Sequence, residues 1–262
     1  MKASHKKLAA ELACDYHVAS NNSPWLLKLP VIKQVNFSEH VQELMEEGPR
    51  QIDSDTDTQA FQCTGKASDM TLIDALARRK SSREFSKSAL DLQKFGQLLG
   101  LSNGLRNKVG NANDSGRNAP SAGSLCSCEM YVLALNVADL EKGIYHYDVG
   151  AHGLKQLKLG DFKEWSKRML LLQSELCDSA AFIFLASNQG RLRSKYGPRA
   201  YRLGLLDAGH VSENIYLVSA ALNLAVTATG GFIDDELNNA LGLDGVDDCV
   251  VLVLAVGEPA GA

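Results

Sequence analysis

The sequence predicts an α+β fold, and three observations support this class. Short apolar runs of strand length mix with stretches of helical periodicity, without the strict strand–helix–strand rhythm of a doubly wound fold. No segment repeats at a period of about 20–50 residues, which disfavours solenoids and propellers. The chain has 262 residues, of which 45% are hydrophobic and 22% charged. This length and composition suit one large globular domain with an appendage.

The charge balance and the cysteines exclude several function classes. The formal net charge of −4 argues against a nucleic-acid partner, because such proteins usually carry a basic face. No apolar run approaches the ~20 residues of a membrane span, and the first residues lack the apolar core of a signal peptide. We therefore expect a cytoplasmic protein with no membrane partner and with reduced thiols. Cys126 and Cys128 lack a second ligand pair at zinc-site spacing, so no metal is expected.

Residues 1–67 differ from the rest of the chain. A first helix is predicted over Lys6–Cys14, and the polar run from Gln51 to Thr58 is typical of a loop or linker. We interpret 1–67 as an amino-terminal extension, a candidate docking element by its position, and 68–262 as the main domain.

Regular patterning begins at the start of the main domain. Ser68 or Asp69 is expected to cap a helix that runs to about Lys80, since apolar residues recur on one of its faces. A second helix is predicted over Asp91–Leu99. The Gly/Asn-rich stretch Gly100–Asn118 follows, and a loop of that length is either functional or disordered.

The middle of the chain predicts strands. Met130–Val137 is one, and Ile144–Asp148 and Leu154–Leu159 flank a Gly-containing turn as a hairpin. Asp161 is expected to cap a helix that ends near Leu176, and Ala181–Ala186 is typical of a buried strand.

The last third alternates helix and strand. Tyr201–Leu224 predicts a long, mostly apolar helix, and Ala225–Thr229 predicts a short strand that ends at Gly230-Gly231. Asp234–Leu241 predicts a short helix, and Val250–Val256 a final buried strand.

Two stretches could bind an anion or a flat ligand. Arg78–Arg83 is either a basic helix end that complements the helix dipole, or an anion site in which hydroxyls lie among guanidinium groups. Arg117–Ser124 is either a simple turn or a place where small side chains let a flat ligand approach the backbone.

Two further stretches could carry chemistry. Arg191–Arg202 holds five cations and two phenols, so it is a polyanion patch, a solvated loop or the place of a catalytic pair. The third alternative arises because a lysine beside other cations can act as a base. Asp207, His210 and Asn214 form one polar stripe on an apolar helix, and either a neighbouring loop or a cofactor could satisfy it.

Five motifs occur together in a characteristic order, from Ser68 to Gly257. They are R-x-S-x-R (Arg79–Arg83), P-S-A-G (Pro120–Gly123), K-Y-G-x-R-A-Y-R (Lys195–Arg202), L-L-D-A-G-H (Leu205–His210) and G-G-F (Gly230–Phe232). In this combination the chain resembles the nitroreductase superfamily. Within it the chain is similar to the SagB-type dehydrogenases, which include the azoline oxidases of microcin and cyanobactin biosynthesis.

The resemblance implies an FMN-binding homodimer with a central mixed sheet flanked by helices, and a flavin at the subunit interface. It implies that Lys195 and Tyr196 are the catalytic pair. The residues expected to bind the cofactor are Arg79, Ser81 and Arg83 at the phosphate, Pro120, Ser121, Ala122 and Gly123 along the ring, Gly230 and Gly231 near its reactive edge, and Asn214.

The implied reaction aromatises a thiazoline or oxazoline of a ribosomal precursor peptide. A proton leaves Cα, a hydride leaves Cβ for the flavin, and a lysine or tyrosine serves as base. Cyclodehydratase subunits of a synthetase would be the partners. Two alternatives remain: a reductase of nitro or quinone compounds that uses NAD(P)H, and a flavin-free structural subunit.

The chain departs from the family pattern at three places. Ser124-Leu-Cys126-Ser127 stands where Ala-Leu-Tyr-Pro is frequent, and Glu213-Asn214 where Gln-Asn is common. The basic pair that other nitroreductases carry near the carboxyl terminus is absent. These departures suggest a different pocket shape and a differently assembled phosphate site.

Overall fold

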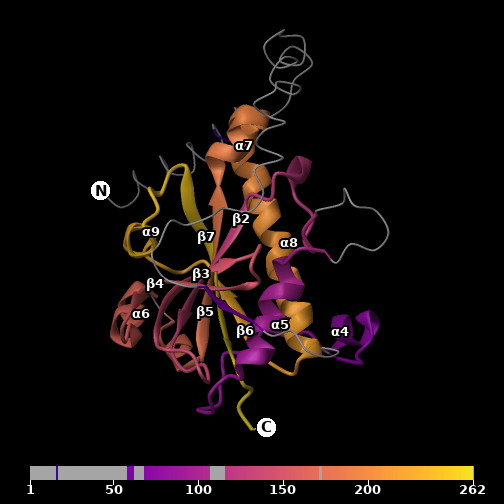
Figure 1. Cartoon of the computed structure of the whole chain (residues 1–262), viewed down its shortest axis with the longest axis vertical. Helices are drawn as coiled ribbons and strands as arrows, with labels where there is room; N and C mark the ends of the chain where they lie inside the picture. Colours follow the sequence, from indigo (N-terminus) through magenta and orange to yellow (C-terminus); the bar gives the residue numbers. More distant parts are fainter. Residues whose placement is uncertain (1–15, 17–57, 62–67, 107–115, 171–172, 262) are drawn as a thin grey trace, which may run out of the picture.

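The computed structural model describes residue 16 and residues 58–61, 68–106, 116–170 and 173–261. Its centre is a seven-stranded sheet with helices packed on both faces (Figure 1), which confirms the α+β class. The strands are β1 (Thr58–Ala60), β2 (Cys128–Ala134), β3 (Gly143–Asp148), β4 (Gly153–Leu159), β5 (Ala181–Asn188), β6 (Ala225–Thr229) and β7 (Asp248–Gly257).

The strand order across the sheet is β1-β4-β3-β2-β5-β7-β6, and each neighbouring pair of these described strands is antiparallel. The prediction of a mixed sheet is therefore wrong for this part of the chain. The cause is the connectivity: β2, β3 and β4 follow one another directly, and the helical excursion after β5 brings β7 back in the opposite direction. The predicted hairpin of β3 and β4 is confirmed.

The predicted helices occur in the predicted order, and one further helix begins at Gln189, where the sequence predicted none. They are α4 (Leu72–Arg78), α5 (Leu92–Asn103), α6 (Lys163–Met169), α7 (Gln189–Tyr196), α8 (Ala200–Ala221) and α9 (Asp234–Leu241), with short 3₁₀ helices η2 (Ala122–Ser124), η3 (Ser174–Asp178) and η4 (Gly197–Arg199).

The helix ends correct three predictions. Thr71, and not Ser68 or Asp69, caps α4, because its hydroxyl accepts a hydrogen bond from Asp74 N. Asp91 caps α5, as expected of a helix that starts there, but α5 continues to Asn103 through part of the predicted loop. Helix α6 ends at Met169, where Leu170 turns to an extended conformation and bridges Phe232, so the predicted end near Leu176 is wrong.

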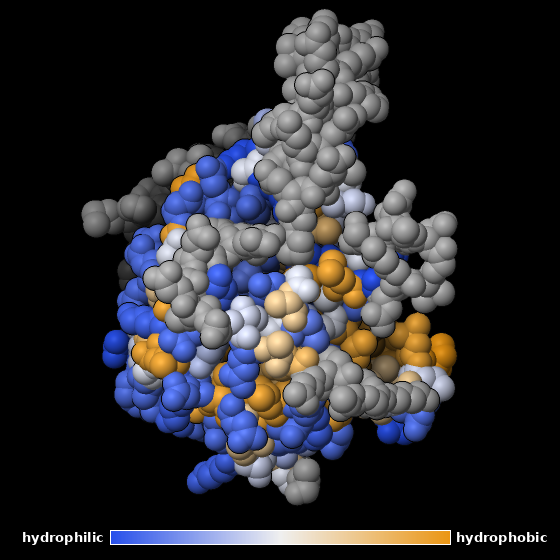
Figure 2. Space-filling model, in the orientation of Figure 1, coloured by the Kyte–Doolittle hydropathy of each residue, from blue (hydrophilic) through white to orange (hydrophobic). Residues whose placement is uncertain are grey.

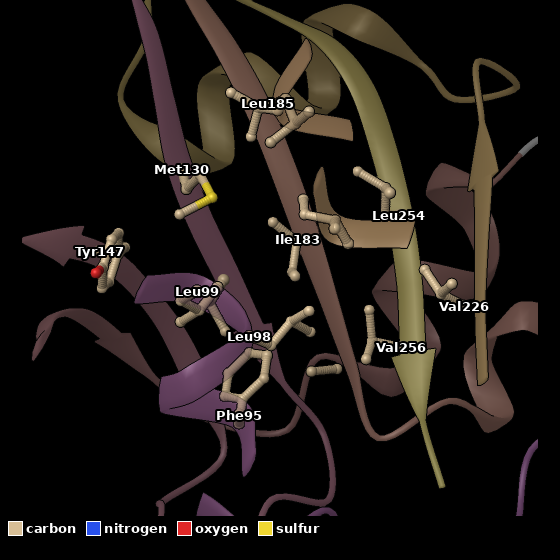
Figure 3. Packing of buried hydrophobic residues seen from close by; sticks show 14 of the residues in the cluster. Phe95, Leu98, Leu99, Met130, Tyr147, Ile183, Leu185, Val226, Leu254 and Val256 are labelled. Atoms are coloured by element: carbon tan, nitrogen blue, oxygen red, sulfur yellow. The ribbon is translucent and has the colours of Figure 1, made fainter. Parts of the chain in front are cut away.

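Both faces of the sheet are buried. On β2, Met130 and Val132 face a core shared with α5 and α8, whereas Tyr131 and Leu133 face a second core shared with α6 and α9. Figure 3 shows the first core, in which side chains of α5 pack against those of β2, β5 and β7. The continuous apolar character of these strands follows from this two-sided burial.

Residues 58–61 join the sheet although they precede the predicted boundary at residue 67. β1 pairs with β4, and Phe61 N donates to His152 O over 2.9 Å. The Phe61 ring lies so close to Gly96 that an added Cβ there would sit 2.6 Å from the ring. The predicted helix Lys6–Cys14 and most of the proposed docking element lie outside the described residues. Among the described helices, none is both long and apolar enough to cross a membrane.

Candidate active site

Asp207 ties the loop 120–127 to helix α8. Its side chain is only 2% exposed. One carboxylate oxygen accepts from Ala122 N at 3.0 Å, and the other accepts from Ser127 Oγ at 2.8 Å. Burial raises the pKa of Asp207, while these two hydrogen bonds and the charge of His210 oppose that rise. The predicted polar stripe thus finds a neighbouring loop as its partner at Asp207.

The loop presents the backbone of Gly123 to the predicted catalytic pair. Gly123 has φ of +57°, and Ser124 and Cys126 also have positive φ values, of 58° and 50°. A Cβ on Gly123 would lie 2.6 Å from Lys195 Nζ and would collide with Tyr196 Oη. Glycine therefore fits here with the least strain, and the structure brings the P-S-A-G motif together with Lys195 and Tyr196.

Lys195 and Tyr196 close helix α7. Asn188 caps the start of this helix by accepting from Arg191 N at 2.8 Å. Buried Leu192 packs with Leu125, which fixes the helix against the loop. Lys195 Nζ lies 5.6 Å from the centroid of the Tyr196 ring. Burial, and then the negative charge of Asp207, raise the pKa of Tyr196, so this phenol is protonated at neutral pH.

A buried ion pair holds the start of the same loop. Arg117 Nη2 lies 3.3 Å from Glu129 Oε1, and His146 Nε2 lies 3.4 Å from Glu129 Oε2. Arg117 and Glu129 are 6% and 3% exposed. Burial alone would raise the pKa of Glu129, but the hydrogen bond with His146 and the charge of Arg117 together hold that pKa below its ordinary value. Sequence reasoning missed Glu129, although a charged residue within an apolar strand was a usable signal.

The segment that carries Arg79, Ser81 and Arg83 follows α4 along the edge of the sheet. Ser82 N donates to Val226 O on β6 over 2.9 Å, which aligns this segment with the edge strand. Ser81 Oγ lies 3.1 Å from Tyr216 Oη, and Arg79 Cζ lies 5.5 Å from the centroid of the Tyr216 ring. All three predicted phosphate-binding side chains are exposed and accessible to a ligand.

The alternate residues of this segment line a cavity. Arg78, Lys80 and Ser82 line it together with Tyr216 and the carboxyl-terminal Pro259, and its volume is about 420 Å³. Successive residues of an extended chain face opposite sides. Arg78 and Lys80 are therefore cations beside this cavity that the sequence motif did not name.

The remaining predicted cofactor residues lie near β6 and α5. Gly230 and Gly231 directly follow β6, and an added Cβ on Gly230 would meet nothing within 4 Å. Asn214 Nδ2 donates to Ser102 O near the end of α5 over 3.0 Å. This amide therefore joins two helices, and its prediction as a cofactor ligand is neither supported nor contradicted by that contact.

Most of the predicted residues fall into two groups within one subunit. The loop 120–123 is tied to α8 at Asp207 and lies against the Lys195–Tyr196 pair, and the segment 79–83 is tied to α8 at Tyr216. These two anchors are nine residues apart, or about 14 Å along the helix.

The chain belongs to the nitroreductase family, whose sequence profile matches residues 76–258. This confirms the family that the five motifs predict. A nitroreductase of Methanocaldococcus jannaschii is 27% identical over 190 residues, which cover 72% of this chain and 92% of that protein. The trifolitoxin-processing protein TfxB of Rhizobium leguminosarum bv. trifolii is 28% identical over 130 residues, but these cover 48% of this chain and 35% of that protein.

Solved structures share the fold. A nitroreductase from Anabaena variabilis is 31% identical with a TM-score of 0.62, over 72% of this chain and 38% of that one. A chain of the E. coli microcin synthetase McbBCD, solved with truncated pro-MccB17 bound, is 19% identical with a TM-score of 0.62, over 95% and 92%. A nitroreductase of Exiguobacterium sibiricum in complex with FMN is 13% identical with a TM-score of 0.52, over 78% and 91%. The trifolitoxin match agrees with the predicted SagB-type group, and the microcin synthetase match shows the shared fold.

The buried pair gives a prediction for stability. Glu129→Gln should lower the free energy of unfolding by about 3–5 kcal/mol at pH 7, because it leaves Arg117 buried without a counter-charge. Because the folded-state pKa of Glu129 is lowered, the contribution is present above the ordinary value of 4.5 and is lost as pH falls through the folded-state value. Urea unfolding at pH 7 and at pH 3 measures both effects.

The matched control is Glu175→Gln at an exposed position, which should change little at either pH. A Glu129→Gln deficit of the same size at pH 7 and pH 3 would contradict the proposed charge pairing.

Proposed function

We propose that the protein is an FMN-dependent oxidase that converts thiazoline or oxazoline rings of a ribosomal precursor peptide to thiazole or oxazole. The observation that carries this proposal is the placement of the Lys195 amine and the Tyr196 phenol over the bare backbone of Gly123. The relatives named for trifolitoxin processing and for a microcin synthetase support a peptide substrate.

The residues present fit FMN. Two guanidinium groups and a hydroxyl, from Arg79, Arg83 and Ser81, match the charge and the acceptor oxygens of a phosphate. The small side chains of the P-S-A-G loop let a flat ring approach its backbone. The loop Pro120–Gly123 would line that ring, and Gly230 and Gly231 would offer backbone groups beside it. The FMN-bound structure of a family member supports this choice of cofactor.

Aromatisation of the azoline removes a proton from Cα and a hydride from Cβ. When bound, FMN supplies the hydride acceptor, with molecular oxygen as the terminal acceptor. Lys195 Nζ is the proposed base for the Cα proton. Tyr196 keeps its own proton because burial and Asp207 raise its pKa, so it can donate a hydrogen bond that orients the substrate.

An apolar surface on α4 supports the homodimer. Leu72, Ile73 and Leu76 are 64%, 73% and 50% exposed. Figure 2 shows hydrophobic surface over the α4 region. A second copy that covers this surface could bring its loop 120–123 toward the segment 79–83 of the first subunit, and so join the two groups that α8 holds apart.

The partners of the synthetase remain proposals as well. An azoline must first be installed by a cyclodehydratase, so we propose such subunits as partners. The extension 1–67 is the proposed docking element.

One specific observation favours a second candidate. The Methanocaldococcus relative is named a nitroreductase and matches over 92% of its length. A reductase of nitro or quinone compounds that uses NAD(P)H is therefore the alternative, and rapid bleaching of the bound flavin by NAD(P)H would favour it. A flavin-free structural subunit is the third possibility, and failure to bind FMN would favour that.

One prediction of the proposed function concerns the cofactor site. Arg79→Ala/Arg83→Ala should weaken FMN binding by about 100-fold, because it removes two charge-assisted contacts to the phosphate. Fluorescence titration with FMN measures this. The matched control Arg78→Ala/Lys80→Ala removes the two cations that face the cavity, and it should retain affinity. The reverse pattern would assign the phosphate to the cavity.

The second prediction tests the catalytic pair. Lys195→Ala should keep bound flavin and lower azoline oxidation by about 100-fold or more, since the base is lost. Mass spectrometry counts the two hydrogens that the azoline peptide loses. Lys167→Ala, on the remote helix α6, serves as the control. Full activity of Lys195→Ala would eliminate this residue as the base.

The third prediction tests the homodimer. Ile73→Asp should convert the dimer to a monomer in sedimentation velocity, because it places a charge in an apolar contact. Val246→Asp changes another exposed apolar residue, at 67% exposure, and should leave the dimer intact. A dimer that survives Ile73→Asp would place the subunit contact elsewhere.

A further inference from the structure

Tyr216 joins three parts of the candidate cofactor site. It lies on α8, its hydroxyl accepts from Ala228 N on β6 at 2.8 Å, and the same hydroxyl lies 3.1 Å from Ser81 Oγ. Its ring lies under the Arg79 guanidinium, 5.5 Å from Cζ to the centroid. No motif in the sequence singled out this residue.

The contacts of Tyr216 define the direction of its hydrogen bonds. A backbone N–H can only donate, so Tyr216 Oη is the acceptor for Ala228. A phenol carries one hydrogen of its own, and Ser81 Oγ is an acceptor at hydrogen-bond distance from it. If the phenol donates to Ser81, the single hydrogen of Ser81 is turned away from Tyr216 and is available to an anion.

The Tyr216 ring also orients the N–H donors of Arg79. A guanidinium that stacks on an aromatic face keeps its N–H groups in its own plane, directed outward. Arg79 and Ser81 are two residues apart on the extended segment, which Ser82 fixes to the edge strand through Val226 O. Both donors are therefore held on the same side by one tyrosine.

We infer that Tyr216 is a positioning residue for the phosphate of the flavin nucleotide, which orients Ser81 as a donor and Arg79 as its neighbour. This inference rests on the proposed function and deepens it. It names the residue that makes the site select a phosphorylated flavin over riboflavin, which has the same ring and no phosphate.

The test compares the affinities of the full chain for FMN and for riboflavin by fluorescence titration. Tyr216→Phe should weaken FMN binding by about tenfold and change riboflavin binding by less than about twofold. Ser81→Ala should show the same selective loss. The double variant should be no weaker than Ser81→Ala, because both act through one hydrogen-bond chain. Ser81→Thr, which keeps a hydroxyl, should restore FMN binding.

The control is Tyr201→Phe, which changes an exposed tyrosine on the same helix and should leave both affinities unchanged. Equal losses of FMN and riboflavin in Tyr216→Phe would overturn the inference, because they would show a general effect on the pocket. Additive losses in the double variant would also overturn it. A wild-type chain that binds neither flavin would overturn the proposed function itself, and this inference with it.

Discussion

The buried polar side chains of helix α8 are the constraint on which the rest of the site depends. A carboxylate that is 2% exposed must be hydrogen-bonded, since an unpaired buried charge is strongly destabilising. The described partners of Asp207 are Ala122 N and Ser127 Oγ, so the left-handed backbone between them is fixed by the helix. Tyr216 fixes the segment 79–83 in a similar way, from about two and a half turns further along the helix. The active-site segments are loops, but a rigid helix determines their positions.

This arrangement also gives Lys195 and Tyr196 different roles. Burial, and then the negative charge of Asp207, raise the pKa of the Tyr196 phenol, so the carboxylate that shapes the loop also disfavours ionisation of Tyr196. Lys195 is then the group of the pair that is suited to accept a proton. The absent Cβ of Gly123 leaves room for both side chains, which links the glycine of the P-S-A-G motif to the K-Y motif in physical terms.

Much of the fold could be predicted from local sequence, and the failures have physical causes. The hairpin of β3 and β4 was predictable because turn residues separate two apolar runs. The direction of the strands could not be predicted. Antiparallel strands often alternate apolar and polar residues, but these strands are buried on both faces and are apolar throughout. The cap of α4 was ambiguous, because Ser68, Asp69 and Thr71 are all favourable cap residues and tertiary contacts decide among them. The motifs identified Lys195 and Gly123. Glu129 could have been found as a charge within an apolar strand, whereas Tyr216 became evident only from contacts between distant segments.

The visible absorption spectrum of the purified protein, before and after incubation with FMN, tests the central claim most directly. The account predicts the spectrum of a bound flavin, with a released chromophore that is FMN and not riboflavin. A folded protein that stays colourless after incubation with FMN would contradict the proposed cofactor, and with it the roles assigned to Arg79, Ser81 and Lys195.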